Sequence, residues 1–243
     1  VVRFDGKRYK NFFSDYSNPN STTDNVAVDV VEDKNGDLWI AGHSKGVARY
    51  NQRTGVFKKY PVLSNDNNPI YGINRVVNDA EQQLWFGTSG RGLARYNFQK
   101  DTFDFFYPEP AYPKDGTLRG FNHINDIVQD PANVNLLWVA GFHGLYLFNK
   151  AEKQFTKFTY PGTGSVADIL ITDLELQPGG LMWVGTWSKG MKCFNIKERK
   201  YVSRPIPLFA DVVNDIKLVN DSTLYAACLS QGLVRYHIPS NTA

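Results

Sequence analysis

The sequence has little of several residue types that mark particular classes of protein. It contains two cysteines, Cys193 and Cys228, in 243 residues. Two cysteines are too few for a disulfide scaffold or a four-cysteine zinc site, so we expect both to be small buried residues. No apolar run approaches the ~20 residues of a membrane helix, and we expect no direct membrane insertion of this segment.

The net charge is small, and the N-terminus has no signal-peptide pattern. Charged residues make up 21% and the formal net charge is +3, which gives no electrostatic basis for nucleic-acid binding. The first residues lack the order of a signal peptide and do not begin with methionine. We therefore expect a processed chain or an excised piece of a longer protein.

Strand-forming and turn-forming residues are abundant. Aromatic residues make up 14%, and 20 glycines and 12 prolines punctuate the chain. Many strand formers separated by many turn formers are typical of an all-β fold. The length suits a single repetitive β architecture, which needs no disulfide or metal to stay folded.

An internal repeat covers the whole chain. An apolar residue followed by an aromatic recurs, with the aromatics 46, 53, 45 and 42 residues apart. These aromatics are Trp39, Trp85, Trp138, Trp183 and Tyr225. A second signal, an aromatic followed by a polar residue, recurs six times in register with the first. Its aromatics are Phe4, Tyr50, Tyr96, Phe148, Phe194 and Tyr236. A period of ~46 residues is the size of one four-stranded propeller blade.

One repeat unit predicts four strands, named a to d. Residues 26–32 form strand a, 38–41 strand b, 47–50 strand c and 56–60 strand d. Gly36, in the a–b turn, supplies the positive φ that such a hairpin requires. We interpret the ladder of large aromatics as packing between adjacent sheets, because a single blade cannot bury both of its faces.

The repeat predicts a single β-propeller region over residues 1–243. It begins with a half blade and ends with an incomplete blade, and full blades lie between them. The predicted ranges are 1–13 for the half blade, 26–60, 73–107, 124–160 and 169–204 for the full blades, and 213–238 for the incomplete blade. We therefore expect a partial piece, of about five to six blades, of a larger ring. The alternative is a smaller closed ring in which an N-terminal strand completes the last blade.

The unit resembles a known repeat. Asp33-Lys34-Asn35-Gly36-Asp37-Leu38-Trp39-Ile40-Ala41-Gly42 and Gly92-Leu93-Ala94-Arg95-Tyr96-Asn97 are similar to the regulator-propeller repeat. The unit looks most like the periplasmic sensor domain of hybrid two-component systems of the Bacteroidetes type. The resemblance implies a seven-bladed propeller, usually followed by a second propeller, a β-sandwich, a membrane helix and a kinase. It also implies a periplasmic sensor of polysaccharide breakdown products.

Few residues suggest catalysis or metal binding. The histidines His43, His123, His143 and His237 lie in different repeats, and none has a second ligand at metal spacing. Asp33, Asp79 and Asp130 recur at one structural position, the a–b turn, which favours turn chemistry over a glycosidase pair. We expect no metal, no cofactor and no catalytic residues.

Departures from the repeat are the best candidates for a binding site. The b–c loops lie on one face of a propeller, and they carry His43, Arg91, His143, Trp187 and Lys189. Trp187 is the one tryptophan outside the ladder, and an exposed ring flanked by polar donors suits a sugar. The alternative is that Trp187 caps the face or meets another domain. The longest d–a connection, residues 107–123, is a second candidate, although a plain linker or interdomain contact fits as well.

Three function classes compete. The favoured hypothesis is a non-catalytic extracytoplasmic sensor module that binds an oligosaccharide and relays this to a kinase elsewhere in the protein. Its partners would be the oligosaccharide, the remaining propeller and sandwich domains of the same protein, and a second copy in a homodimer. The alternatives are a propeller-fold lyase or glycosidase and a protein-interaction scaffold. The enzyme would need a converging acid and base, which the sequence does not reveal.

Overall fold

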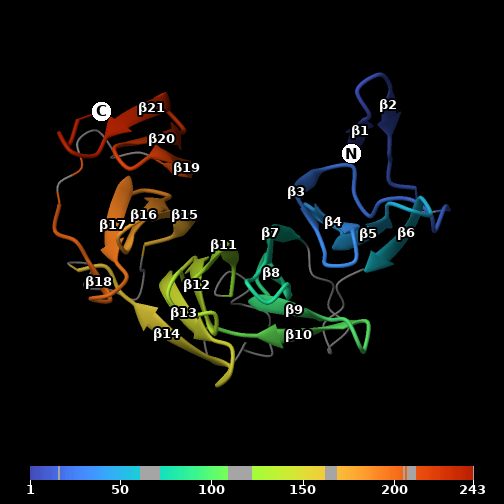
Figure 1. Ribbon diagram of the computed structural model, residues 1–243, viewed down its shortest axis with the longest axis horizontal. Helices are drawn as coiled ribbons and strands as arrows, with labels where there is room; N and C mark the ends of the chain where they lie inside the picture. The colour runs from blue at the N-terminus through green and yellow to red at the C-terminus, as the bar shows by residue number, and fades with distance from the viewer. Residues whose placement is uncertain are drawn as a thin grey trace. The chain divides into compact units, whose positions relative to one another are not determined.

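The computed structural model describes residues 1–15, 17–60, 72–108, 122–161, 169–204, 206 and 212–242. All regular secondary structure in these residues consists of β-strands, so the prediction of an all-β fold is confirmed (Figure 1). The chain divides into two compact units. The N-terminal unit ends at Ile124 and the C-terminal unit begins at Asn125.

The N-terminal unit contains a hairpin and two four-stranded sheets. The strands of each sheet pair in chain order. The hairpin consists of β1 (Val2–Phe4) and β2 (Tyr9–Asn11). Blade 1 consists of β3 (Ala27–Glu32), β4 (Asp37–Gly42), β5 (Val47–Asn51) and β6 (Val56–Tyr60). Blade 2 consists of β7 (Ile73–Asn78), β8 (Leu84–Thr88), β9 (Leu93–Asn97) and β10 (Thr102–Phe106).

The C-terminal unit contains two four-stranded sheets and one three-stranded sheet. Blade 3 consists of β11 (Ile124–Gln129), β12 (Leu136–Gly141), β13 (Gly144–Asn149) and β14 (Gln154–Phe158). Blade 4 consists of β15 (Ile171–Gln177), β16 (Leu181–Thr186), β17 (Met191–Asn195) and β18 (Lys200–Tyr201). Blade 5 consists of β19 (Val213–Asn220), β20 (Thr223–Cys228) and β21 (Gly232–His237).

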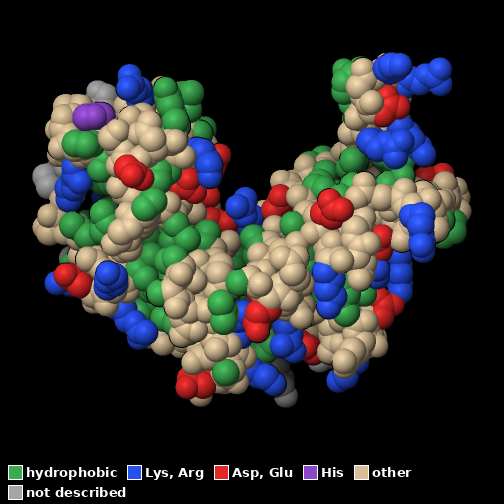
Figure 2. All heavy atoms as spheres, in the orientation of Figure 1, with side chains coloured by type: hydrophobic (Ala, Val, Ile, Leu, Met, Phe, Trp, Pro, Cys, Tyr) green, Lys and Arg blue, Asp and Glu red, His purple; other side chains and the backbone are tan. Residues whose placement is uncertain are grey.

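The hairpin presents basic and aromatic side chains to solvent. Figure 2 shows Lys and Arg side chains gathered over β1 and β2. The exposed cations are Arg3, Lys7, Arg8 and Lys10. Phe4 and Tyr9, which are paired in register, stack with their ring centroids 4.6 Å apart. This stack contributes to hairpin stability, because cross-strand aromatic pairs are the unit of sheet stabilisation.

Large aromatics fill the space between successive blades of each unit. Trp39, Trp85, Trp138 and Trp183 are at most 1% exposed. Trp39 of blade 1 lies 4.4 Å from Tyr96 of blade 2, and Trp183 of blade 4 lies 5.6 Å from Tyr236 of blade 5, between ring centroids. Trp138 of blade 3 lies 5.2 Å from Phe194 of blade 4 in the same way, so within each unit a strand-b tryptophan meets the strand-c aromatic of the following blade. Burial of such large rings is a main source of the stability of the stack.

Tyr225, the fifth aromatic of the ladder, differs from the tryptophans because it is only partly buried. It lies on β20 of blade 5, and no described sheet follows blade 5 along the chain. Leu233 on β21 is 70% exposed, whereas Leu93 at the same position of blade 2 is fully buried. Equivalent strand positions are thus more exposed in blade 5 than in blade 2.

Buried carboxylates hold the indole groups of the ladder. The Nε1–H groups of Trp39, Trp85 and Trp138 donate to Asp33, Asp79 and Asp130, each at 2.8 Å. The same carboxylates accept backbone N–H groups of their a–b turns, as Asp33 does from Asn35 at 2.8 Å and from Asp37 at 3.1 Å. The expectation of turn chemistry at these aspartates is correct but incomplete, since a buried indole N–H also requires an acceptor.

Side chains on strand a couple successive blades. The Asp29 carboxylate of blade 1 accepts the Val76 N–H of blade 2 at 2.9 Å. Asp126 and Asp173 do the same for Leu174 and Ile216, at 2.9 and 2.8 Å. In β3 and β15 a β-bulge lies beside this position, between Ala27 and Asp29 and between Ile171 and Asp173. A bulge re-aims a side chain, and here it directs a carboxylate to the next blade.

We expect Asp33→Ala to lower the free energy of unfolding by about 1–3 kcal/mol, because it leaves the buried indole N–H of Trp39 without its acceptor. Asn35→Ala is the matched control, since Asn35 lies exposed on the same turn. Chemical denaturation of both variants measures the difference. Equal stability of the two variants would show that the carboxylate does not hold the indole.

Candidate functional site

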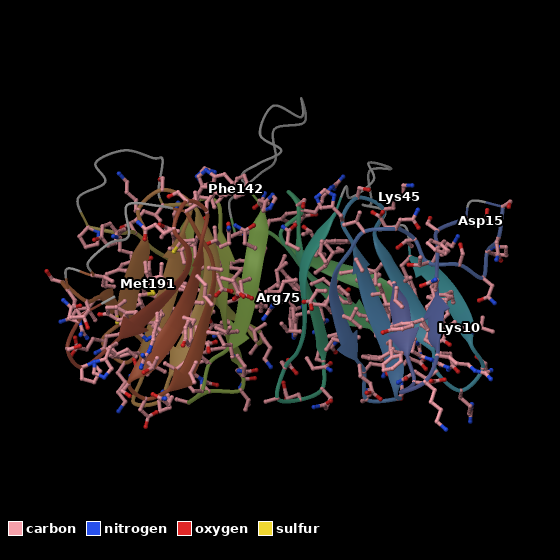
Figure 3. The ribbon with its side chains drawn as sticks, turned by 90° about the horizontal axis from the view of Figure 1, so that it is seen from above. Lys10, Asp15, Lys45, Arg75, Phe142 and Met191 are labelled. Atoms are coloured by element: carbon pink, nitrogen blue, oxygen red, sulfur yellow. The ribbon has the colours of Figure 1, made fainter. Side chains whose placement is uncertain are left out.

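The b–c turns carry all five residues of the sequence-derived site. His43 and Trp187 are exposed first residues of the turns after β4 and β16, and Lys189 is exposed two residues beyond Trp187. Arg91 and His143, after β8 and β12, are half-buried. Figure 3 shows two neighbours of these residues, Lys45 and Phe142, each at the strand ends of its own unit.

The first residue of these turns is fixed by a recurring backbone contact. The N–H of His43 donates to the Val26 carbonyl at 3.0 Å, and Ser89, Trp187 and Leu229 make the same bond to the start of strand a in their own blades. The four side chains therefore occupy equivalent places. They differ in chemistry, because blades 1 and 2 present His43 and Ser89 and blades 4 and 5 present Trp187 and Leu229.

Buried threonines hold the two turns that carry Arg91 and Lys189. Thr88 Oγ1 donates to the Gly92 carbonyl at 2.8 Å and accepts the Arg91 N–H at 2.9 Å. Thr186 makes the same pair of bonds to Gly190 and Lys189, at 2.6 and 2.9 Å. Both threonines are fully buried. Sequence reasoning missed them, although a threonine ends strand b in both repeats.

The turn of blade 1 is held differently. Asp24, which precedes strand a, accepts the backbone N–H of Ser44 at 2.8 Å and its hydroxyl at 2.9 Å. Burial acts to raise the pKa of Asp24, but the hydrogen bonds from Ser44 and Val26 outweigh it and lower the pKa below its ordinary value. Asp24 is therefore ionised at neutral pH and holds the His43 turn.

A polar chain joins blade 2 to the end of the long d–a connection. The Ser89 hydroxyl donates to Asn74 Oδ1 at 3.0 Å, and Asn74 Nδ2 lies 2.8 Å from His123 Nε2 and donates to the Ile124 carbonyl at 2.8 Å. Because Nδ2 is a donor, this arrangement places the acceptor nitrogen of His123 at Nε2. The other residues singled out in this connection, 109–121, lie outside the described residues.

The structure brings only part of the predicted site together. In the N-terminal unit, the loops of His43 and Arg91 belong to consecutive blades. Gly72 lies between these loops, so close that a Cβ there would stand 2.1 Å from the His43 carbonyl oxygen. In the C-terminal unit, Trp187 and Lys189 share one turn, and His143 lies in the turn of the preceding blade. A common site formed by all five residues stays a prediction.

Sequence reasoning also missed a polar cluster between blades 1 and 2. Asp101 accepts the hydroxyls of Tyr60 and Tyr96 at 2.7 and 2.5 Å and forms an ion pair with Lys58. Burial acts to raise the pKa of Asp101, but the hydrogen bonds from Lys58, Tyr96 and Tyr60 lower this pKa to about 2. Burial raises the pKa of Tyr60 well above its usual range, so its hydroxyl stays protonated.

The two cysteines are inert in their surroundings. Cys193 and Cys228 are free thiols, 3% and 5% exposed. Burial raises the pKa of Cys193 to about 11, while the nearby Arg204 acts to lower it. Both residues pack in the core of blades 4 and 5, as the sequence predicts. No cluster of three or more metal-binding side chains occurs among the residues that the structure describes.

Comparison with solved structures places the fold. The chain is similar to the extracellular domain of BT3049 from B. thetaiotaomicron, described as a hybrid two-component system, with a TM-score of 0.73 and 22% identity. It is also similar to the extracellular domain of BT4673 from the same organism, described as a one-component system, with a TM-score of 0.68 and 19% identity. The two matches cover 100% and 96% of this chain, but they span only 31% and 28% of the chains of the solved structures.

A third similar structure has a different origin. The β-propeller domain of Cps50 (Swd1) from Myceliophteria thermophila matches with a TM-score of 0.61 and 13% identity, over 89% of this chain and 67% of that one. The chain therefore has a β-propeller fold, and its neighbours include the class that the sequence resembles. No family model and no curated protein sequence matches the chain. Across the described segments, no helix is long and apolar enough to cross a membrane.

We expect Asp101→Asn to alter the pH dependence of stability. The folded pKa of Asp101 lies below its ordinary value of 3.8, so ionised Asp101 stabilises the fold above about pH 4, and this stabilisation is lost as the pH falls toward 2. The variant should be less stable than the parent by about 1 kcal/mol at pH 6, after discounting for the partial exposure of the pair. This difference should shrink toward pH 2 in denaturant titrations.

Glu152→Gln is the matched control for this experiment. Glu152 is exposed on the c–d turn of blade 3, and the substitution replaces one carboxylate by an amide in the same way. A pH-independent difference between Asp101→Asn and the parent would contradict the assignment of the lowered pKa to Asp101.

Proposed function

We propose that this chain is a non-catalytic extracytoplasmic sensor module, which binds an oligosaccharide and relays its presence to a kinase elsewhere in the same protein. The likeness to extracellular domains of signalling proteins over nearly all of the chain supports a sensor role. A periplasmic location and the relay to a kinase belong to this proposal, because the chain spans only about a third of the BT3049 structure.

Trp187 carries the proposal of sugar binding. Its side chain is 54% exposed, whereas the other four tryptophans are at most 1% exposed. An indole face packs well on the apolar face of a pyranose, and polar neighbours can bond the hydroxyls. The turn supplies such neighbours in Ser188 and Lys189, and the Trp187 and Lys189 backbones are fixed by hydrogen bonds. A preorganised turn loses little entropy on binding.

The roles of the recurrent carboxylates support a non-catalytic chain. Asp33, Asp79 and Asp130 are buried and each binds the indole of its own blade. A general acid or base must instead reach the substrate. A protein-interaction scaffold stays the alternative, in which the exposed Trp187 would contact a protein. The propeller-fold lyase or glycosidase would reveal itself by turnover of a polysaccharide.

We expect Trp187→Ala to weaken oligosaccharide binding by about 1–3 kcal/mol, because the variant loses the stacking surface. Its folding stability should stay within about 0.5 kcal/mol of the parent, since the side chain is exposed. Calorimetric titration with a panel of oligosaccharides measures the first effect, and thermal unfolding measures the second.

Trp85→Ala is the contrasting variant. Removal of this buried ring should cost about 3–5 kcal/mol of folding stability, with any lost binding a consequence of unfolding. Binding of the cognate sugar by Trp187→Ala as tightly as by the parent would place the site elsewhere. Steady turnover of a polysaccharide by the purified chain would overturn the non-catalytic role.

A further inference from the structure

A second polar cleft lies in the N-terminal unit, at the a–b and c–d turns and therefore away from the b–c turns of the proposed sugar site. It encloses about 270 Å³, near the lower limit of ligand pockets. Blade 1 contributes one residue from its a–b turn, and blade 2 contributes the rest. The lining residues are Lys34, Gln83, Arg95, Asn97, Phe98 and Gln99. We call this space the Lys34–Arg95 cleft.

The lining is cationic, and both cations are held in place. Lys34 Nζ lies 4.4 Å from the centroid of the Phe98 ring. The Arg95 guanidinium lies 5.9 Å from the Trp85 ring and 5.8 Å from the Phe106 ring, and its Nη2 donates to Asp104 at 2.6 Å. Asp104 does not line the cleft, and one carboxylate cannot occupy all N–H groups of a guanidinium. The lining therefore contributes the Lys34 ammonium group and those Arg95 N–H groups that do not bond Asp104.

Blade 1 provides an internal comparison. Its equivalent cleft encloses about 220 Å³ and contains Arg49 at the position of Arg95. There Asp37 accepts Arg49 Nε at 2.7 Å and Nη2 at 2.6 Å, so the arginine is paired within the lining itself. In blade 2 the position of Asp37 is occupied by Gln83. A carboxylate in the lining is thus replaced by a neutral amide, and Arg95 pairs instead with Asp104 on strand d, outside the lining.

The amides in the cleft define what else a ligand must carry. Gln83 Nε2 donates to the Tyr96 carbonyl at 2.5 Å, which leaves Oε1 as an acceptor. Asn97 Oδ1 accepts the N–H groups of Gln99 and Lys100 at 3.1 and 3.0 Å, which leaves Nδ2 as a donor. A ligand that satisfies this lining has an anionic oxygen group for the cations and hydroxyls for the amides.

We propose that the Lys34–Arg95 cleft binds one anionic sugar ring, with its carboxylate or sulfate group between Lys34 and Arg95 and its hydroxyls on Gln83 and Asn97. Charge-assisted hydrogen bonds to the oxyanion supply most of the affinity, and the amides discriminate a sugar from a bare anion. The site is separate from Trp187 and does not depend on the proposed function of the b–c turns.

The probe for this site is glucuronate, titrated into the full chain and followed by the side-chain amide NMR signals of Gln83, Asn97 and Gln99. We expect these signals to shift in a saturable way with glucuronate. Glucose-6-sulfate should shift the same signals, since it carries a negative charge on a similar ring, and the ratio of the two affinities shows which oxyanion the cleft prefers. Neutral glucose should bind at least about tenfold more weakly, because it forms no charge-assisted bonds.

Two variants test the chemistry of the lining. Lys34→Gln should weaken glucuronate binding about tenfold by removing one charge-assisted bond. Gln83→Asp should abolish binding, because it recreates the Asp37–Arg49 pair of blade 1 at Arg95, and blade 1 shows that the fold tolerates this pair. Lys100→Gln is the matched control, since it removes an exposed charge from the same c–d turn without touching the lining, and its affinity should stay within about twofold.

Trp187→Ala separates this proposal from the proposed function, and it should leave the glucuronate shifts unchanged. Equal binding of glucose and glucuronate would overturn the role of the two cations. Inorganic sulfate binding as tightly as glucuronate would overturn the assignment to a sugar. Absence of shifts at the three amides would overturn the site as a whole, whatever happens at Trp187.

Discussion

The burial of one indole in each four-stranded blade is the constraint on which the rest of the structure depends. A four-stranded sheet has two faces to cover, and a tryptophan on strand b reaches the strand-c aromatic of the following blade, as Trp39 reaches Tyr96. Burying the ring also buries its N–H, which requires an acceptor. The aspartate of the a–b turn meets this need and closes the turn. In blade 4 the same task falls to Gln177, 2.9 Å from Trp183 Nε1, where Gly179 and Gly180 form the turn with positive φ.

Hydrogen bonds between successive blades fix the strands from which the b–c turns extend. A carboxylate on strand a crosses to the next blade, and the bulge beside it sets its direction, as at Asp173. Arg75, labelled in Figure 3, stands where the other first strands carry aspartate, with its Nε 3.9 Å from Asp29. The b–c turns connect strands that pair, directly or through strand b, with these first strands. Their first residues can therefore vary from histidine to tryptophan without loss of the backbone contact that positions them.

Much of the fold could be predicted from sequence because the period and the a–b turns are local signals. The covering of Tyr225 could not, since it depends on whether another sheet packs against blade 5. The Asp101 cluster had a readable but subtle signal. Asp101, Lys153, Arg199 and Asn241 share a positive-φ position in the turn that follows strand c of their blades. The hydroxyls of Tyr96 and Tyr236, near the end of strand c, donate to Asp101 and Asn241. Blade 1 departs from this pattern, because Gly55 stands at the same turn position after Tyr50. Where strand c ends in Phe148 or Phe194, no hydroxyl needs an acceptor and the turn carries a cation.

A repeat protein can acquire chemistry without losing its fold at positions that are not tied to a buried group. Positions that hold the indole or the tyrosine hydroxyl are tied in this way, so a change there costs stability. Position 37 of blade 1 and position 83 of blade 2 are different, because the first pairs a half-exposed arginine and the second does not. The exchange of Asp for Gln leaves the backbone bonds to the turn carboxylate intact, at 3.1 Å for Asp37 and 2.9 Å for Gln83. The carboxylate partner of the arginine can thus move from the lining, as Asp37 in blade 1, to strand d, as Asp104 in blade 2, while the backbone bond of the a–b turn is kept.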